Sequence, residues 1–178
     1  GVVRVGNGIP ELQWDTIKRV KSSACMVVPS FLMKMVDFAQ NNNIDYNNST
    51  LKRAICIGEA LRNPDGELTT LGKKISEQWG ALELYSTYAS TEMQTSFTEC
   101  EAHEGGHIPA DLIIVELLDD NEQPVKDGEP GEVTITTIGV EAMPLLRFRT
   151  GDICIRTSVP CKCGRNSARL SSVIGRKG

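Results

Sequence analysis

Apolar and polar residues alternate along the first half of the chain in a pattern that predicts helices and strands in turn. Apolar residues recur at three- and four-residue spacings in three segments, which predicts helices over residues 10–20, 31–40 and 68–79. Short apolar runs predict strands at residues 2–5, 24–28, 53–57 and 81–85. Pro10 suits a helix start, and Ser30 suits the N-cap of the second helix. Strands and helices joined by such short links indicate an α/β fold, with a parallel sheet flanked by helices.

The pattern changes after Glu92 to short apolar runs separated by Gly, Pro, Asp and Asn, without a helical period. These runs predict antiparallel strands at residues 112–118, 132–137, 146–149 and 153–157. We therefore expect two subdomains, an α/β part over residues 1–93 and a β-rich, distorted barrel-like part over residues 94–178.

Charge and composition exclude several classes of protein. The net charge is −4 and no basic stretch is dense, so nucleic acid is not an expected partner. No apolar run approaches the ~20 residues that a membrane helix needs. Six cysteines without a targeting segment favour free thiols in the cytoplasm over a secreted disulfide scaffold. The chain lacks a starting methionine and ends directly after a loop signature, so we expect a piece of a longer protein.

The segment from Leu84 to Glu92 contains the first candidate chemistry. An apolar run leads into two aromatic rings, Tyr85 and Tyr88, into the hydroxyls of residues 86–87, and finally into Thr91 and Glu92. In open α/β sheets, ligands bind at the C-terminal edge of the strands. The rings can stack on a flat heterocycle, the hydroxyls can hold phosphate oxygens, and a carboxylate is a hard ligand suited to Mg²⁺. A plain turn with a solvated glutamate is the alternative.

Two further motifs make this segment specific. Tyr88-Ala-Ser-Thr-Glu92, Thr150-Gly-Asp152 and Gly175-Arg176 follow one another in an order and spacing that resemble the adenylate-forming (acyl-CoA synthetase) superfamily. Within it, the chain looks most like the phenylacetate–CoA ligase branch, which includes coenzyme F390 synthetases. The resemblance covers nearly the whole chain. It implies that the chain corresponds to the middle of such an enzyme, within the enzyme's large N-terminal domain.

The resemblance also implies roles for individual residues. Glu92 would bind the magnesium on ATP and Thr91 would contact the phosphate to be attacked. Tyr88 would lie against the adenine and Asp152 would accept both ribose hydroxyls. Arg176 would contact the ribose at the hinge to a C-terminal domain.

A second strand-end turn completes the nucleotide site that the resemblance implies. Gly58-Glu59-Ala60 matches the branch's Gly-Glu-Pro turn, whose backbone lies along the adenine, and the Ser86–Thr87 hydroxyls belong to the same site. Ala60 replaces the usual proline and makes the turn less rigid. A structural ion pair is the alternative reading for Arg147 and Arg149, and we prefer it for Arg149.

A separate set of cysteines and a histidine indicates a metal site. Cys161 and Cys163 form a tight thiol pair before a glycine turn, and Cys100 and His107 can supply two more ligands. Three cysteines and one histidine suit a closed, tetrahedral zinc site that stabilises a fold. Members of the phenylacetate–CoA ligase branch share this pattern. The sequence leaves open whether His103 or Cys154 replaces one ligand, and unligated thiols are the alternative.

The resemblance implies an acid–thiol ligase. A carboxylic acid and ATP would give an acyl-adenylate and pyrophosphate, and coenzyme A would then displace AMP to give a thioester. The phosphate loop and the catalytic lysine of the family are expected outside this sequence, so we expect this fragment alone to be inactive. Two alternatives stay open, a zinc-stapled binding module and an adenylation domain that loads an acid onto a carrier protein. The sequence identifies neither the acid nor the oligomeric state.

Overall fold

The structure, a computed structural model, describes residues 1–6 and 8–177. The chain forms two compact units. Unit 1 comprises Gly1–Leu61 and Leu68–Tyr85, and unit 2 comprises Arg62–Glu67 and the chain from Ser86 onward. Each unit has its own cluster of buried apolar side chains.

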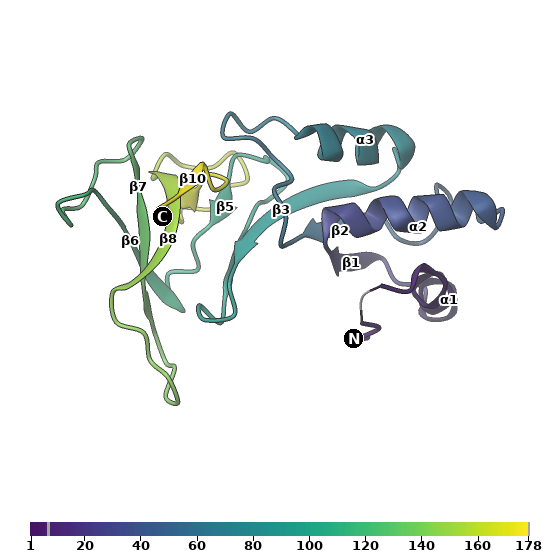
Figure 1. Cartoon of the computed structure of the whole chain (residues 1–178), viewed down its shortest axis with the longest axis horizontal. Helices are drawn as coiled ribbons and strands as arrows, with labels where there is room; N and C mark the ends of the chain where they lie inside the picture. The colour runs from purple at the N-terminus through teal and green to yellow at the C-terminus, as the bar shows by residue number, and fades with distance from the viewer. Residues whose placement is uncertain (7, 178) are drawn as a thin grey trace. The chain divides into compact units, whose positions relative to one another are not determined.

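Unit 1 contains the predicted alternation of strands and helices. Its elements are α1 (Pro10–Val20), β1 (Ala24–Val27), α2 (Pro29–Asn41), β2 (Arg53–Cys56), α3 (Thr70–Gln78) and the first residues of β3 (Glu83–Ala89). Strands β1 and β2 pair in parallel, as predicted, and β2 lies between β1 and β3. Helix α2 contacts both α1 and α3 (Figure 1).

Aromatic side chains fill the core of unit 1. The rings of Trp14 in α1 and Trp79 after α3 lie 5.3 Å apart, and the edge of Tyr46 packs on Trp79. The Trp14 indole N–H donates to the Met35 carbonyl at 3.0 Å, so its polar atom is satisfied inside the core. These contacts bind the three helices into one packed layer.

Three details of unit 1 differ from the sequence-based prediction. Residues 2–5 form no strand, and Val2 is 93% exposed, because no neighbouring strand pairs with this apolar segment in the described structure. Helix α2 begins at Pro29, so Ser30 lies inside its first turn and does not act as the N-cap. The strand predicted to end at residue 85 instead continues as β3 through Ala89.

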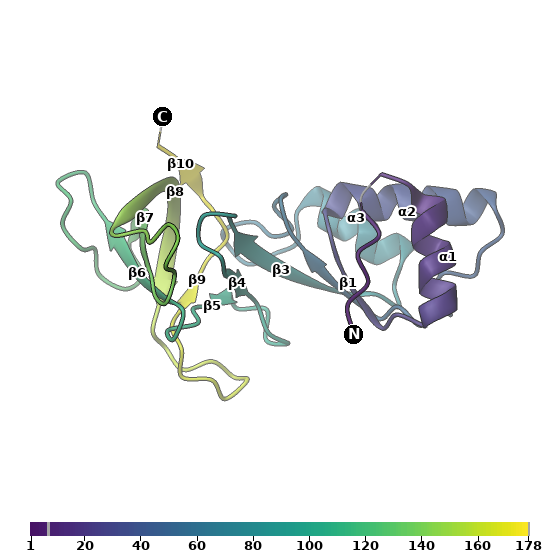
Figure 2. The same ribbon diagram turned by 90° about the horizontal axis from the view of Figure 1, so that it is seen from below.

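Unit 2 is an antiparallel β structure. After the end of β3 it contains β4 (Ser96–Thr98), β5 (Gly106–His107), β6 (Ile113–Leu118), β7 (Pro130–Thr137), β8 (Phe148–Thr157), β9 (Arg169–Leu170) and β10 (Gly175–Arg176). The strand order is β3-β4-β5-β9-β8-β7-β6, with β10 added to β8 (Figure 2). Strands β3 and β6, at the two ends of this order, do not pair with each other. The sheet is therefore curved but not closed, so unit 2 is not the distorted barrel that the sequence predicted.

The two strands predicted at residues 146–149 and 153–157 are one strand, β8. Thr150-Gly-Asp152, which turn statistics favour as a loop, therefore lies within a strand. Gly151 has φ +76°, a left-handed conformation that side chains disfavour, and the pairing with β7 shifts register nearby. This irregularity places Asp152 opposite Arg176 in the β8–β10 pair.

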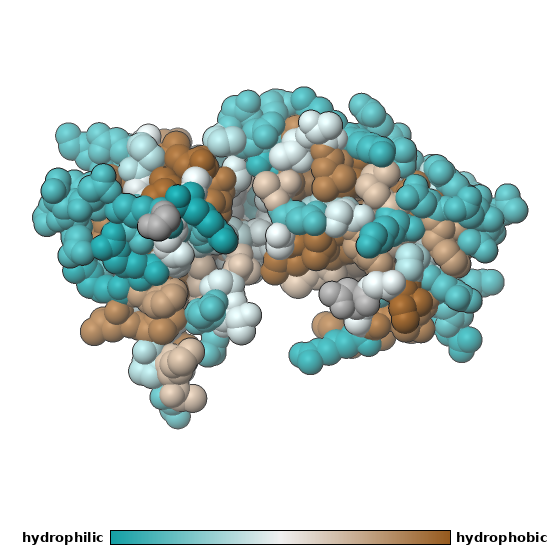
Figure 3. Space-filling view, in the orientation of Figure 1, coloured by the Kyte–Doolittle hydropathy of each residue, from teal (hydrophilic) through white to brown (hydrophobic). Residues whose placement is uncertain are grey.

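The buried core of unit 2 lies between its strands and includes Phe97, Ile113, Val133, Ile135 and Leu170. Several apolar side chains also remain on its surface, over β6 and the connection from β7 to β8 (Figure 3). They are Leu112, Ile114, Ile138, Met143, Leu146 and Phe148. None of the helices in the described residues is long and apolar enough to cross a membrane.

Candidate functional site

Tyr88, Asp152 and Arg176 meet in unit 2, although they come from three different strands. The Tyr88 hydroxyl donates to Oδ2 of Asp152 at 2.8 Å, and Arg176 Nε donates to Oδ1 at 2.7 Å. The Asp152 side chain is 8% exposed, whereas Arg176 is 82% exposed. Thr150 Oγ1 lies 3.4 Å from the Tyr88 oxygen and accepts from the Asp152 backbone N–H. A buried carboxylate thus has a partner on each oxygen.

The protonation of Tyr88 follows from its surroundings. Burial raises the pKa of its hydroxyl above the ordinary value, and the neighbouring Asp152 carboxylate raises it further. The hydroxyl therefore stays protonated near neutral pH and acts as the donor to Asp152. The Tyr88 ring also packs on Phe97, with centroids 5.6 Å apart and planes tilted by 42°.

The β3–β4 hairpin positions the other residues of the first motif. Thr87 is buried and its hydroxyl lies 2.6 Å from that of Thr98, inside the hairpin. Ala89 pairs with Ser96 in extended conformation, which a residue with a Cβ atom adopts without strain. Thr91 and Glu92 lie in the exposed turn that follows β3. The backbone N–H of Glu92 and the Ser90 hydroxyl lower the pKa of the Glu92 carboxyl.

The four residues expected from unit 1 make local contacts there. Both oxygens of the Glu59 carboxylate bind Ser30, one its backbone N–H at 2.9 Å and the other its hydroxyl at 2.8 Å. Glu59 thus takes over the capping of α2 that was predicted for Ser30. Gly58 has φ +83°, and Ala60 is exposed with its carbonyl accepting from Thr69. The Tyr85 hydroxyl donates to Glu83.

The two arginines of the second motif both form ion pairs. Arg149 pairs with Glu132 and Glu122, as preferred from the sequence. Arg147 pairs with Glu116 at 3.1 Å. Both arginines therefore act as structural ion-pair partners in unit 2.

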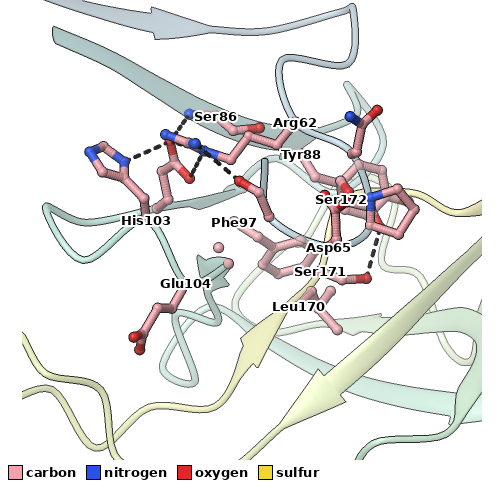
Figure 4. A pocket seen from close by; sticks show the side chains of 16 residues that line it. Arg62, Asp65, Ser86, Tyr88, Phe97, His103, Glu104, Leu170, Ser171 and Ser172 are labelled. Atoms are coloured by element: carbon pink, nitrogen blue, oxygen red, sulfur yellow. Dashed lines mark hydrogen bonds and ion pairs between the residues drawn. The ribbon is translucent and has the colours of Figure 1, made fainter. Parts of the chain in front are cut away.

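A cavity of about 320 Å³ opens beside Tyr88, within unit 2 (Figure 4). The rings of Tyr88 and Phe97 and the side chain of Leu170 contribute its apolar surface. Its polar lining comes from the 62–66 loop, from Ser86, from residues 103–106, and from Ser171 and Ser172. The cavity thus combines an aromatic and apolar side with many polar side chains.

Glu99 holds one side of this cavity together, although no motif in the sequence indicates a role for it. Its side chain is 1% exposed and accepts from Arg62 Nε on both oxygens, at 2.9 and 3.1 Å. It also accepts from the Ser86 backbone N–H at 2.6 Å and contacts Nδ1 of His103 at 3.1 Å. No pattern in the sequence distinguishes Glu99 from the nearby Glu101 and Glu104; only its position beside Cys100 hints at a structural role.

The four predicted metal ligands lie together in unit 2. The ligand atoms of Cys100, His107, Cys161 and Cys163 are all within 4.8 Å of one another. The sulfurs of Cys100 and Cys161 are 3.6 Å apart, and Cys163 Sγ is 3.5 Å from His107 Nε2. Tetrahedral zinc with 2.3 Å bonds to sulfur needs sulfurs about 3.8 Å apart, so the donor set and spacing fit this ion.

The surroundings of the cluster suit metal binding further. His107 Nδ1 lies 2.8 Å from the Ser167 hydroxyl, which leaves Nε2 facing the cysteines. Burial lowers the pKa of His107, with help from Arg165 and Arg169, and so favours the neutral ring that a metal requires. A hydrogen bond from the Arg165 backbone lowers the pKa of Cys163 to about 7. Cys154 is buried in the core and His103 binds Glu99, so neither belongs to the cluster.

Comparison with curated proteins gives several relatives of one kind. The phenylacetate-coenzyme A ligase of Thermus thermophilus is 29% identical over 180 residues, covering 98% of this chain and 39% of that protein. The phenylacetate-coenzyme A ligase of Aromatoleum evansii is 28% identical, over 98% of this chain and 38% of its own length. The chain therefore spans less than two-fifths of the curated relatives that it matches.

Solved structures share the fold. A 2-hydroxyisobutyryl-CoA ligase in complex with 2-HIB-AMP and CoA matches with a TM-score of 0.81 at 23% identity, covering 98% of this chain and 37% of that one. A long-chain-fatty-acid-CoA ligase from Archaeoglobus fulgidus matches with a TM-score of 0.61 at 16% identity, over 94% of this chain and 37% of its own. A family model described as AMP-binding enzyme matches residues 3–143, and the chain therefore belongs to the AMP-binding enzyme family.

Proposed function

We propose that this chain is the nucleotide-binding portion of an ATP-dependent carboxylate–CoA ligase similar to phenylacetate–CoA ligases. The observation that supports this most directly is the pairing of the Tyr88 hydroxyl with the Asp152 carboxylate, beside Arg176. A buried carboxylate with two acceptor oxygens suits a vicinal diol such as that of ribose. The family membership makes AMP the nucleotide to expect.

The adenine would enter the cavity beside Tyr88. The Tyr88 ring offers an apolar face for a heterocycle, the tilted Phe97 ring adds apolar surface, and Ser86 offers polar groups at the same cavity. Asp152 is bonded to the Tyr88 hydroxyl, so a base against this ring would leave its ribose near the carboxylate. The ribose hydroxyls would then replace or share the present partners of Asp152.

Thr91 and Glu92 would bind the triphosphate of ATP and its Mg²⁺ ion. The lowered pKa of Glu92 keeps its carboxyl ionised at neutral pH, and ionised carboxylates are ligands that Mg²⁺ prefers. Magnesium would offset the charge that builds on the phosphate. Thr91 is exposed in the same turn, where its hydroxyl would donate to a phosphate oxygen.

The reaction would proceed in two half-reactions. A carboxylate oxygen attacks the α-phosphorus of ATP and pyrophosphate leaves, which gives an acyl-adenylate. The thiol sulfur of coenzyme A then attacks the acyl carbon and AMP leaves, which gives the thioester. The residues of this chain would act by binding and orienting the nucleotide. The full reaction is proposed for the longer protein, since this chain spans about 39% of its relatives.

We further propose that Cys100, His107, Cys161 and Cys163 bind a structural Zn²⁺. Zinc held by four protein ligands stabilises folded structure and leaves no open position for catalysis. None of the six cysteines, all of which lie in the described residues, forms a disulfide, which supports a cytoplasmic location.

Calorimetric titration of the chain with AMP tests the nucleotide site. We expect Asp152→Ala to weaken binding at least tenfold. Asp111→Ala, which removes an exposed carboxylate before β6, is the matched control and should bind like the parent chain. Equal affinities for the two variants would refute the role of Asp152.

A second experiment measures ATP–pyrophosphate exchange, which should be absent from this chain alone. Appreciable exchange would show that the other parts of the longer protein are not needed for adenylate formation.

A further inference from the structure

The loop between two of the metal ligands forms one wall of the cavity beside Tyr88. Cys100 and His107 stand at the two ends of this loop. Four of its residues, His103 to Gly106, line the cavity together with Glu99, which directly precedes Cys100 (Figure 4). The metal cluster and the cavity are therefore built from the same short segment.

The loop packs too tightly on its neighbours to move independently of the cavity. A Cβ atom at Gly106 would collide with the Phe97 carbonyl group. A Cβ atom at Gly105, where φ is +100°, would lie 2.6 Å from the Leu170 carbonyl oxygen. Phe97 and Leu170 themselves line the cavity. A shift of the loop must consequently change the shape of the cavity.

Glu99 connects the loop to the other walls. Its carboxylate binds Arg62 of the 62–67 loop, the Ser86 backbone N–H of β3 and the His103 ring of the loop between Cys100 and His107. Arg62 also donates to the Gly66 carbonyl, which fixes the 62–67 loop in turn. Because Glu99 is buried, removing its charge would leave Arg62 without its counterion.

The remaining metal ligands lie in the segment that leads into β9, which also borders the cavity. Cys161 and Cys163 lie between β8 and β9, and β9 pairs with β5 through His107 and Arg169. The chain after β9 lines the cavity with Ser171 and Ser172. A single ion bound to all four ligands would cross-link two of the segments that border the cavity.

We propose that metal binding at Cys100, His107, Cys161 and Cys163 and nucleotide binding in the adjacent cavity strengthen each other, with Glu99 as the positioning residue between them. The ion orders the cavity wall before the nucleotide arrives, so the nucleotide no longer bears that entropic cost. Thermodynamic linkage then requires the nucleotide to raise the affinity for the metal by the same factor. This inference rests on the proposed nucleotide site.

Reciprocal titrations of the chain test the coupling. The affinity for AMP is measured by calorimetry with zinc-loaded and chelator-treated protein, and the affinity for zinc is measured with a competing chromophoric chelator with and without AMP. We expect both affinities to rise by the same factor, about fivefold or more. Equal AMP affinities in the two metal states overturn the coupling while leaving the nucleotide site intact. No AMP binding by the zinc-loaded chain overturns the nucleotide site, and the coupling with it.

A pair of variants keeps the test decisive if the metal-free chain unfolds. Glu99→Gln leaves all four metal ligands in place, and Glu101→Gln removes an exposed charge from the same loop as the control. Both zinc-loaded variants should contain one zinc per chain. We expect Glu99→Gln to bind AMP about fivefold more weakly than Glu101→Gln does. We also expect that AMP no longer raises the affinity of Glu99→Gln for zinc. Equal AMP affinities, or an undiminished effect of AMP on zinc affinity, would overturn the role of Glu99.

Discussion

The Tyr88 hydroxyl donates to the Asp152 carboxylate at 2.8 Å, across 64 residues of sequence. Tyr88 lies at the end of β3 and Asp152 in the irregular part of β8, next to Gly151. The bond satisfies a carboxylate that is almost fully buried, and a carboxylate in that position costs free energy unless it is paired. The same geometry that stabilises the unit also presents two acceptor oxygens beside an aromatic ring.

Substitution of Tyr88 by phenylalanine should therefore destabilise the protein. It removes the donor to Asp152 and leaves a buried acceptor with one partner fewer, which typically costs about 1–3 kcal/mol. Urea denaturation of the variant and the parent chain measures the difference. Tyr46→Phe is the control, because its hydroxyl takes part in a 3.2 Å bond with the exposed Gln40. Similar losses in both variants would contradict the importance of the Tyr88–Asp152 bond.

Apolar periodicity predicts the positions of the three helices well, because each helix buries part of the apolar stripe that defines it. Helix α1 runs over Pro10–Val20 as predicted and buries Trp14 and Ile17, although Leu12 and Val20, which also fit the helical spacing, are exposed. The apolar run at residues 2–5 failed as a strand, since composition does not show whether a neighbouring strand is available for pairing. Strand β3 extends past residue 85 because β4 pairs with its second half, which local sequence does not encode.

Long-range contacts were predictable only where a motif already specified them. Spacing and resemblance predict the four cysteine and histidine ligands, and their atoms lie within 4.8 Å of one another. Only the resemblance to adenylate-forming enzymes predicts that Tyr88 and Asp152 lie at one site. Glu99 was missed because a buried, multiply bonded glutamate looks like any other loop glutamate in sequence. The identity of the metal stays a prediction.

Two thiols that are wholly or partly withdrawn from solvent, those of Cys154 and Cys25, should make the protein lose stability in alkaline solution. Burial raises the pKa of Cys154 to about 12 and that of Cys25 to about 11, whereas unfolded cysteines titrate near 9. Between these values the unfolded state binds fewer protons than the folded state, so the free energy of unfolding falls as pH rises. Each such thiol contributes a slope of about 1.4 kcal/mol per pH unit.

Cys154→Ala tests this dependence. Above about pH 9 its free energy of unfolding should fall less steeply than that of the parent chain, even though the cavity lowers its stability at neutral pH. Chemical denaturation at several pH values from 7 to 10.5 measures both effects. Parallel curves for the two proteins would show that Cys154 titrates normally in the folded state.

Replacement of Gly106 by alanine should disturb the wall of the cavity. The added Cβ would collide with the Phe97 carbonyl, and overpacking of this kind costs about 1–3 kcal/mol. Gly175→Ala is the control, because nothing lies within 4 Å of its added Cβ and it should change stability by less than about 0.5 kcal/mol. Thermal unfolding distinguishes the two, and equal melting temperatures would mean that the loop moves freely away from Phe97.

Loss of one thiol from the metal cluster should release the ion and destabilise unit 2. Cys163→Ser replaces a thiolate ligand with a hydroxyl, which binds zinc poorly, so the zinc content should fall well below one per chain. Cys25→Ser changes a half-buried thiol of unit 1 outside the cluster and should keep its zinc. Elemental analysis of the purified proteins gives the metal content, and thermal unfolding gives the stability.

Acidification should also release the zinc ion from the parent chain. Zinc binds thiolates and neutral imidazole, so protons compete with the ion for all four ligands. The pKa of Cys163 is lowered to about 7, and this thiol therefore becomes protonated as the pH falls below neutrality. We expect zinc affinity to fall steeply between pH 7 and pH 5 in the parent chain and in Cys25→Ser alike. Affinity that is independent of pH over this range would exclude thiolate ligation, and with it the assignment of Cys100, Cys161 and Cys163 as ligands.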